Sequence, residues 1–173
     1  MNKKFSDKMA VSGYKVFMII TGGGMTAATE STRHGGASAW FLGASLPYSL
    51  ELSADYCWDE DSRVTSKVAQ DMVDSASAIH NGIDRTKGLR IIASCTAVLT
   101  CENERENREH LAYICISVDQ EHGGYKEFNY KLDFKPGSRQ AQEDALATTY
   151  TDLLLHHTQS SQRMVHPELT LLY

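Results

Sequence analysis

The residues of this sequence best suited to chemistry are three consecutive glycines that follow a short apolar run. Residues 16–20 are continuously apolar, Thr21 comes next, and residues 22–24 are all glycine before a helix-forming segment begins at Met25. Glycines between a buried strand and a helix can present successive backbone N–H groups to an anion at the positive end of the helix dipole. The pattern predicts a phosphate or carboxylate site. The alternative is a tight turn in which the glycines only relieve backbone strain.

The same glycines also fit a dinucleotide-binding pattern. Gly22, Gly24 and Ala27 form GxGxxA, and Glu51 stands near the position expected of a ribose-binding acid. That fold needs a repeated strand–helix–strand unit, which a later antiparallel hairpin contradicts. The phosphate-loop pattern is absent because no lysine follows the glycines. No cofactor is therefore expected.

Five strands and four helices are predicted around these residues. Apolar runs predict strands over residues 16–20, 39–46, 89–99, 111–118 and 125–134. Apolar positions three and four residues apart predict a helix that starts near the acidic residues 59–61 and runs to Asn81-Gly82. Further helices are predicted over residues 4–13 and 25–34, and from Ser138 to about residue 157.

The order of these elements predicts an α/β protein. Strands separated by helices tend to lie parallel, whereas the Gly123-Gly124 turn makes the last two strands an antiparallel hairpin. A three-layer α/β/α sandwich with a mixed, mostly parallel five-stranded sheet satisfies both conditions. Residues 1–157 are expected to form a single domain and residues 158–173 a C-terminal tail.

Composition excludes several classes of partner. The 173 residues carry a formal net charge of −5 with scattered Lys and Arg, so a nucleic-acid partner is not expected. No apolar run approaches the roughly 20 residues of a membrane helix, so no membrane partner is expected. Four cysteines without a CxxC pair are typical of reduced residues in a cytoplasmic protein. His156 and His157 are adjacent rather than four residues apart, so no metal site is predicted.

The segment from Thr21 to Ser53 resembles the C-terminal domain of the competence-damage-inducible (CinA) family. That family has a glycine loop after its first strand, then a helix, a small-residue segment, a Phe-Leu-Gly-Gly strand and a Tyr-Ser segment. The matching positions here are Gly36, Ala37, Ser38, Phe41, Leu42, Gly43, Tyr48, Ser49 and Glu51. Arg139 resembles part of the family's Gly-Asp-Arg segment. The resemblance implies the three-layer sandwich, a homo-oligomer and, in active members, amide hydrolysis of nicotinamide mononucleotide.

The residues that would carry this reaction differ here. In active members the loop serine is the nucleophile and a lysine of the Tyr-Ser segment is its base, and Thr21 and Ser53 stand in their places. Thr21 is the remaining catalytic candidate, but a serine does not accept its proton at neutral pH. If active, the protein would be an amidohydrolase of nicotinamide mononucleotide or a related amide, and catalytic impairment is expected.

The expected function is the binding of a small phosphate-bearing molecule, such as a pyridine nucleotide, at the glycine loop. Arg139 would supply the countercharge, because a guanidinium suits a phosphate. The residues expected to bind the ligand are Gly22, Gly23, Gly24, Met25, Tyr48, Ser49, Cys95, Thr96 and Arg139. The alternative is a non-catalytic, oligomeric interaction protein whose glycine loop is structural. In that case the apolar tail, with Leu169, Leu171, Leu172 and Tyr173, docks on its own domain or on another subunit.

Overall fold

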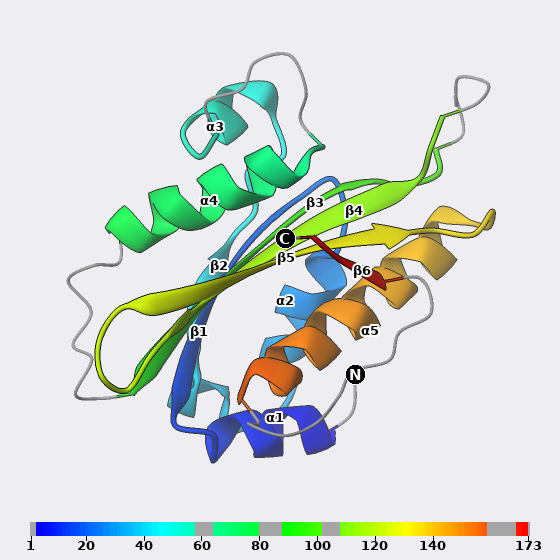
Figure 1. Ribbon diagram of the computed structural model, residues 1–173. Helices are drawn as coiled ribbons and strands as arrows, with labels where there is room; N and C mark the ends of the chain where they lie inside the picture. Colours follow the sequence, from blue (N-terminus) through cyan, green and yellow to red (C-terminus); the bar gives the residue numbers. More distant parts are fainter. Residues whose placement is uncertain (1–2, 58–63, 80–87, 102–107, 159–168, 173) are drawn as a thin grey trace.

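A six-stranded sheet lies between two layers of helices in the computed structural model, which describes residues 3–57, 64–79, 88–101, 108–158 and 169–172 (Figure 1). The strands are β1 (Tyr14–Thr21), β2 (Phe41–Ser45), β3 (Leu89–Val98), β4 (Leu111–Asp119), β5 (Tyr125–Asp133) and β6 (Leu169–Leu172). One face is covered by α1 (Lys3–Ala10), α2 (Met25–Thr32) and α5 (Arg139–Thr158), and the other by α3 (Leu50–Ala54) and α4 (Ser66–Ile79).

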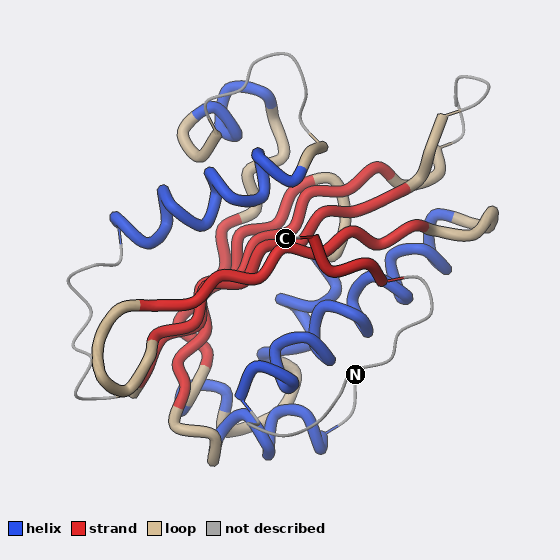
Figure 2. Tube along the Cα trace, in the orientation of Figure 1, coloured by secondary structure: helices blue, strands red, loops and turns tan. Residues whose placement is uncertain are grey.

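The strands lie in the order β2-β1-β3-β4-β5-β6 (Figure 2). β1 pairs in parallel with β2 and β3, and the remaining pairs are antiparallel. β1, β2, β3 and β5 therefore run in one direction, and β4 and β6 in the other. The predicted three-layer sandwich with a mixed sheet is confirmed, and four of the six strands run in the same direction.

The predicted strand number of five is wrong, because a sixth strand lies in the segment taken as a tail. Leu169 to Leu172 pair with Leu132 to Asn129 at the edge of β5. The apolar end thus docks on its own sheet, one of the two possibilities left open by the sequence. A short helix, α3, was also not predicted; Ser49 caps it by accepting a hydrogen bond at Oγ from the Leu52 N–H at 3.2 Å. Both ends of the helix predicted from residues 59–61 to Asn81-Gly82 lie outside the described residues, which give α4 as Ser66–Ile79.

The two parallel connections place a switch point beside β1. β2 and β3 lie on opposite sides of β1, so the chain crosses the sheet in one direction through α2 and in the reverse direction through α3 and α4. Because such crossovers are right-handed, reversing the direction moves the covering helices to the opposite face. In open α/β sheets of this kind, ligands bind beyond the carboxyl ends of the strands at the point of reversal. Here that point lies at the ends of β1 and β3.

Alternation along β1 divides the core between the two helical layers. Val16, Met18 and Ile20 lie in the core cluster beneath α1, α2 and α5, whereas Phe17 and Ile19 pack in the cluster beneath α4. All except Phe17 are fully buried, as expected for a strand covered on both faces. This burial anchors the strand whose end carries the glycine loop.

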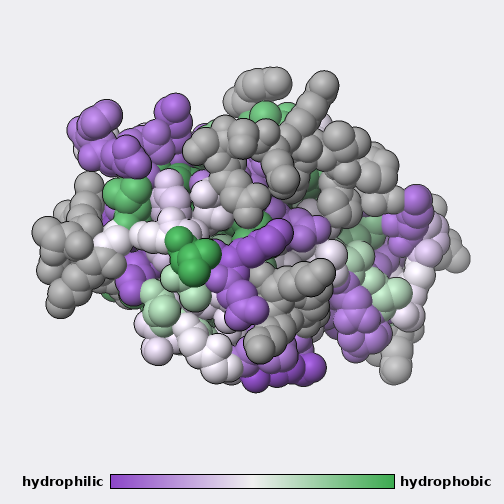
Figure 3. Space-filling view, turned by 90° about the horizontal axis from the view of Figure 1, so that it is seen from below, coloured by the Kyte–Doolittle hydropathy of each residue, from purple (hydrophilic) through white to green (hydrophobic). Residues whose placement is uncertain are grey.

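Three further observations concern the surface, the helices and the cysteines. Seen from below Figure 1, hydrophobic residues lie scattered among hydrophilic ones on the coloured part of the surface (Figure 3). No described helix has the length and apolar character needed to cross a bilayer. None of the four cysteines, all of which are described, forms a disulfide, and Cys57, Cys95 and Cys115 are buried.

Candidate functional site at the ends of the parallel strands

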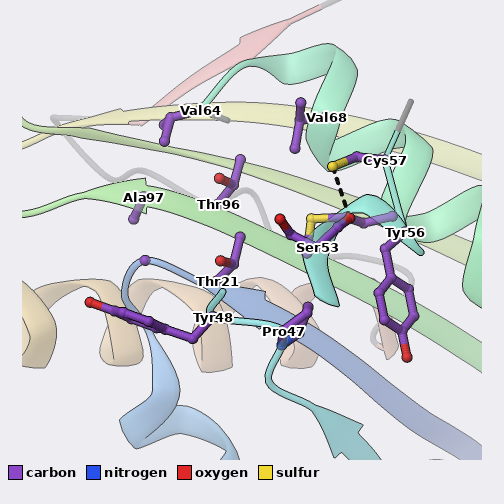
Figure 4. A pocket seen from close by; sticks show the side chains of 12 residues that line it. Thr21, Pro47, Tyr48, Ser53, Tyr56, Cys57, Val64, Val68, Thr96 and Ala97 are labelled. Carbon is purple, nitrogen blue, oxygen red and sulfur yellow. Dashed lines mark hydrogen bonds between the residues drawn. The ribbon is translucent and has the colours of Figure 1, made fainter. Parts of the chain in front are cut away.

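Two threonine side chains lie next to each other at the switch point. Thr21 ends β1, and Thr96 in β3 is its register partner on the neighbouring parallel strand. Both face α4, because Ser94, two residues before Thr96, donates from Oγ to the Ala69 carbonyl of that helix at 2.6 Å. Figure 4 shows the two threonines near Ser53 of α3. Hydroxyl groups that can donate and accept hydrogen bonds therefore gather at the strand ends.

These hydroxyl groups line a cavity of about 160 Å³ (Figure 4). Val64, Val68 and Met72 supply its apolar wall on the α4 side. Tyr48, whose exposed fraction is 63%, lies at its rim. A cavity of about 150 Å³ accommodates a benzene-sized molecule, so this one has room for a single ring.

The cavity offers little for acid–base catalysis. Among the described residues that line it, none is Lys, Arg, His, Asp or Glu. Ser53, which stands where the resemblance expects a lysine, lines it and is buried. Cys57 donates from Sγ to the Ser53 carbonyl at 3.0 Å. The described part of the cavity therefore presents hydroxyl groups near Thr21 but no amine or imidazole to take its proton.

The first glycine of the loop packs tightly on the backbone of β3, and the second lies against the Leu99 side chain. Gly22 has a φ of +78°, and a Cβ atom added there would lie 2.0 Å from the Ala97 carbonyl oxygen. A Cβ atom on Gly23 would lie 2.6 Å from the Leu99 side chain. The structural interpretation of the glycines therefore has a direct packing basis.

The third glycine begins α2, and its amide is already bound by a carboxylate. Gly24 is the N-cap residue, with a φ of +90° and no side chain to cap the helix. Glu143 of α5 accepts a hydrogen bond from the Gly24 N–H at 2.7 Å and another from the Thr26 N–H at 2.9 Å. The anion-binding chemistry inferred from the sequence is present, but the anion on these two amides belongs to the protein itself.

Arg139 contacts the backbone of the glycine loop and of the segment that follows β3. Its guanidinium donates to the Gly22 carbonyl at 3.1 Å and to the Thr100 carbonyl at 3.4 Å. Arg139 thus lies beside the glycine loop, with backbone oxygens as its partners. Glu143 lies one helical turn after Arg139, so the two side chains share a face of α5.

The structure brings together some of the residues expected to bind a ligand. Those that line the cavity are Thr21, Gly22, Tyr48 and Thr96. Those outside its described lining are Gly23, Gly24, Met25, Ser49, Cys95 and Arg139. Ser49 serves instead as the cap of α3, and Met25 packs at the margin of the core beneath α5.

Cys95 lies outside the described lining of the cavity, because successive strand residues point to opposite faces. Its neighbour Thr96 faces α4, so Cys95 faces α5 and is fully buried in that core cluster. Burial raises the pKa of the Cys95 thiol, and the charge of Glu143 raises it further. The thiol is therefore a core side chain and not a nucleophile.

Sequence reasoning missed Glu143 and the cavity wall from α3 and α4. Glu143 bonds to residues 119 and 117 positions away along the chain, a separation that no local pattern reports. Its spacing of four from Arg139 was the available signal, because residues four apart share a helical face. Among the described residues, no three His, Cys, Asp or Glu side chains gather as metal ligands would.

Comparison with solved structures identifies the architecture. The competence/damage-inducible protein CihA from Agrobacterium tumefaciens superposes with a TM-score of 0.69 at 14% identity, covering 90% of this chain and 94% of that one. The chain has a CinA-like fold. The competence damage-inducible protein A (ComA) from Klebsiella pneumoniae gives 0.70 at 11% identity, covering 92% and 98%. A CinA-superfamily protein from Escherichia coli gives 0.66 at 11% identity, covering 89% and 86%.

The likeness is therefore one of structure at low sequence identity. No protein-family model and no curated protein matches the sequence. The similarity in fold extends over 90% or more of this chain in these two comparisons.

Proposed function

We propose that this CinA-like domain binds the ring of a nucleoside or nucleotide, such as a pyridine nucleotide, in the cavity between Thr21 and α4 without cleaving it. The observation that carries the proposal is the position of this cavity at the switch point of the sheet, where α/β folds bind their ligands. Its volume of about 160 Å³ suits one ring. The hydroxyl groups of Thr21, Ser53 and Thr96 suit the polar edge of that ring or a carboxamide on it.

The phosphate of such a ligand contributes little to binding in this proposal. A phosphate on the Gly24 and Thr26 amides would have to displace the carboxylate of Glu143. A phosphate next to the Glu143 carboxylate would be repelled strongly, because two negative charges would meet in a partly buried site. The ring and ribose are therefore the parts recognised, and the phosphate extends away from these two amides.

We infer catalytic impairment because the described lining of the cavity contains no base for Thr21. Hydrolysis of an amide by a hydroxyl nucleophile requires a group that removes the hydroxyl proton. The described lining of the cavity offers Thr21 only other hydroxyl groups and a thiol. We expect no ammonia release from nicotinamide mononucleotide above that of a Thr21→Val variant.

Matched pairs of nucleosides and nucleotides test the binding proposal. Thermal unfolding is followed with nicotinamide riboside and nicotinamide mononucleotide, then with uridine and its monophosphate. In at least one pair, both members are expected to raise Tm by a similar amount of about 4 °C or more at saturation. Thr21→Val should remove the shift, whereas Thr29→Val on the exposed side of α2 should leave it unchanged.

Two results would count against this proposal. A shift seen only with nucleotides would show that the phosphate dominates, as the glycine pattern alone predicts. If none of the nucleosides or nucleotides raised Tm, the cavity would have no ligand of this class. Self-association stays a separate prediction, and the tail gives it no support because Leu169 to Leu172 pair within the chain.

A further inference from the structure

We propose that Glu143 is the specificity-determining residue of the glycine loop: its carboxylate occupies the loop's anion position and turns away ligands that bind through a phosphate. The inference deepens the proposed function and rests on it, since it explains why the ring and not the phosphate is recognised. It begins from the two hydrogen bonds of Glu143, at 2.7 Å to the Gly24 N–H and 2.9 Å to the Thr26 N–H. Each carboxylate oxygen takes one amide, so both ends of the carboxylate are held.

The loop needs an external acceptor because it has none of its own. Gly24 begins α2 without a side chain, and the first turn of that helix contains no acidic residue. The first N–H groups of a helix lack partners within the helix and carry its positive partial charge. Glu143, which comes from another helix, meets both needs with charge-assisted bonds.

Neighbouring contacts hold Glu143 in this place. Arg139, one turn earlier, donates to the carbonyl groups of Gly22 and Thr100. The buried Gln142 accepts a hydrogen bond at Oε1 from the Thr100 N–H at 2.8 Å and donates to the Lys135 carbonyl at 3.2 Å. The first turns of α5 are thus hydrogen-bonded to the segments that follow β1, β3 and β5. A side chain on a helix anchored in this way is pre-organised on the amides, so a competing anion meets a filled position.

Removing the carboxylate should convert the loop into an anion site, and inorganic phosphate is the probe. Thermal unfolding of the wild type, Glu143→Ala and Asp144→Ala is measured in sodium phosphate and in sodium chloride of equal ionic strength. Asp144 is exposed on the same helix and accepts a hydrogen bond from Gln140, so its variant removes one negative charge from α5 while Glu143 keeps its two amides. Phosphate is expected to raise the Tm of Glu143→Ala by about 4 °C or more, saturating at millimolar concentration, and to leave the other two proteins unchanged.

Two outcomes would overturn the inference. Equal stabilisation of the wild type and Glu143→Ala would show that phosphate does not compete with Glu143. No stabilisation of Glu143→Ala would show that the loop is not an anion site once the carboxylate is gone. If Glu143→Ala does not fold, Glu143→Gln keeps the side chain's length with one acceptor oxygen, and it should gain a smaller but saturable phosphate response.

The experiment separates this inference from the proposed function. The nucleoside titration uses the wild type and probes the cavity, whereas the phosphate titration uses the variants and probes the loop. Failure of every nucleoside together with a phosphate response confined to Glu143→Ala would remove the ring site and leave the role of Glu143 standing. Nucleoside binding together with a phosphate-insensitive variant would leave the ring site standing and remove the role of Glu143.

Discussion

Substituting Gly22 by alanine tests whether the glycine loop is required by packing. Two costs follow from the structure. The φ of +78° costs a residue with a side chain about 1–2 kcal/mol. In addition, the new Cβ atom would lie 2.0 Å from the Ala97 carbonyl oxygen, closer than the 3.0 Å that real Cβ atoms keep. The loop must therefore retreat from β3 by about 1 Å, and overpacking of this kind costs a further 1–3 kcal/mol or so.

Gly13 provides a matched control because it has the same φ of +78° with no atom within 4 Å of an added Cβ. Gly13→Ala therefore carries the backbone cost alone, about 1–2 kcal/mol. Gly22→Ala should lose roughly 2–5 kcal/mol in total, a large part of the stability of an ordinary domain. The measurement is urea unfolding followed by circular dichroism, and the two variants should differ by about 1 M in midpoint at similar slope. Equal midpoints for Gly13→Ala and Gly22→Ala would refute the packing argument.

Three further predictions concern stability outside the loop. Burial, helped by the charge of His156, lowers the pKa of His157 from 6.5 to about 4, so the stability that the neutral imidazole contributes is complete above pH 6.5 and is lost as the pH falls toward 4. His157→Phe should therefore reduce the change in unfolding free energy between pH 6.5 and 4 by up to about 3 kcal/mol. If urea unfolding gave the same pH profile for the variant and the wild type, the burial of His157 would be contradicted. Asp119→Ala should cost about 3–5 kcal/mol because it leaves the buried guanidinium of Arg90 without the carboxylate that accepts its Nε–H at 2.9 Å, and a loss below 1 kcal/mol in urea unfolding would contradict it. Deleting residues 169–173 should lower Tm without changing the mass measured by light scattering, whereas a change in mass would show that this strand pairs between chains.

Much of the architecture could be predicted from the sequence because the strands β1 and β3 are largely apolar runs. Residues 16–20 and 89–99 have the composition of strands buried on both faces, and alternation at Phe128, Tyr130 and Leu132 marks a strand with one wet face. The sixth strand was missed because Leu169 to Leu172 form too short a run to distinguish an edge strand from an apolar tail. Its pairing depends on β5, a partner far away in the sequence.

The candidate site, like the fold, could be predicted from the sequence only in part. Local pattern placed Thr21 and the glycines at a strand-to-helix turn, and in the structure the Glu143 carboxylate takes the position that the pattern predicts for an anionic ligand. The occupant of that position could not be predicted, because Glu143 reaches the loop only once α5 has folded against α2. Cys95 lies away from the cavity for a simpler reason, since a shift of one residue along β3 moves a side chain to the other face of the sheet.

In this account a ligand ring enters the cavity beside Thr21 and Thr96, while Glu143 stays bound to the amides of Gly24 and Thr26. The cavity and the start of α2 should therefore respond differently to the same compounds. Two-dimensional NMR of the ¹⁵N-labelled wild type during titration with nicotinamide riboside, its mononucleotide and inorganic phosphate observes both at once. We expect the amide signals of Thr21 and Thr96 to shift with both ring compounds, while those of Gly24 and Thr26 stay in place throughout. Shifts of Gly24 and Thr26 with phosphate or the mononucleotide, with Thr21 and Thr96 unmoved, would contradict both the ring site and the role of Glu143.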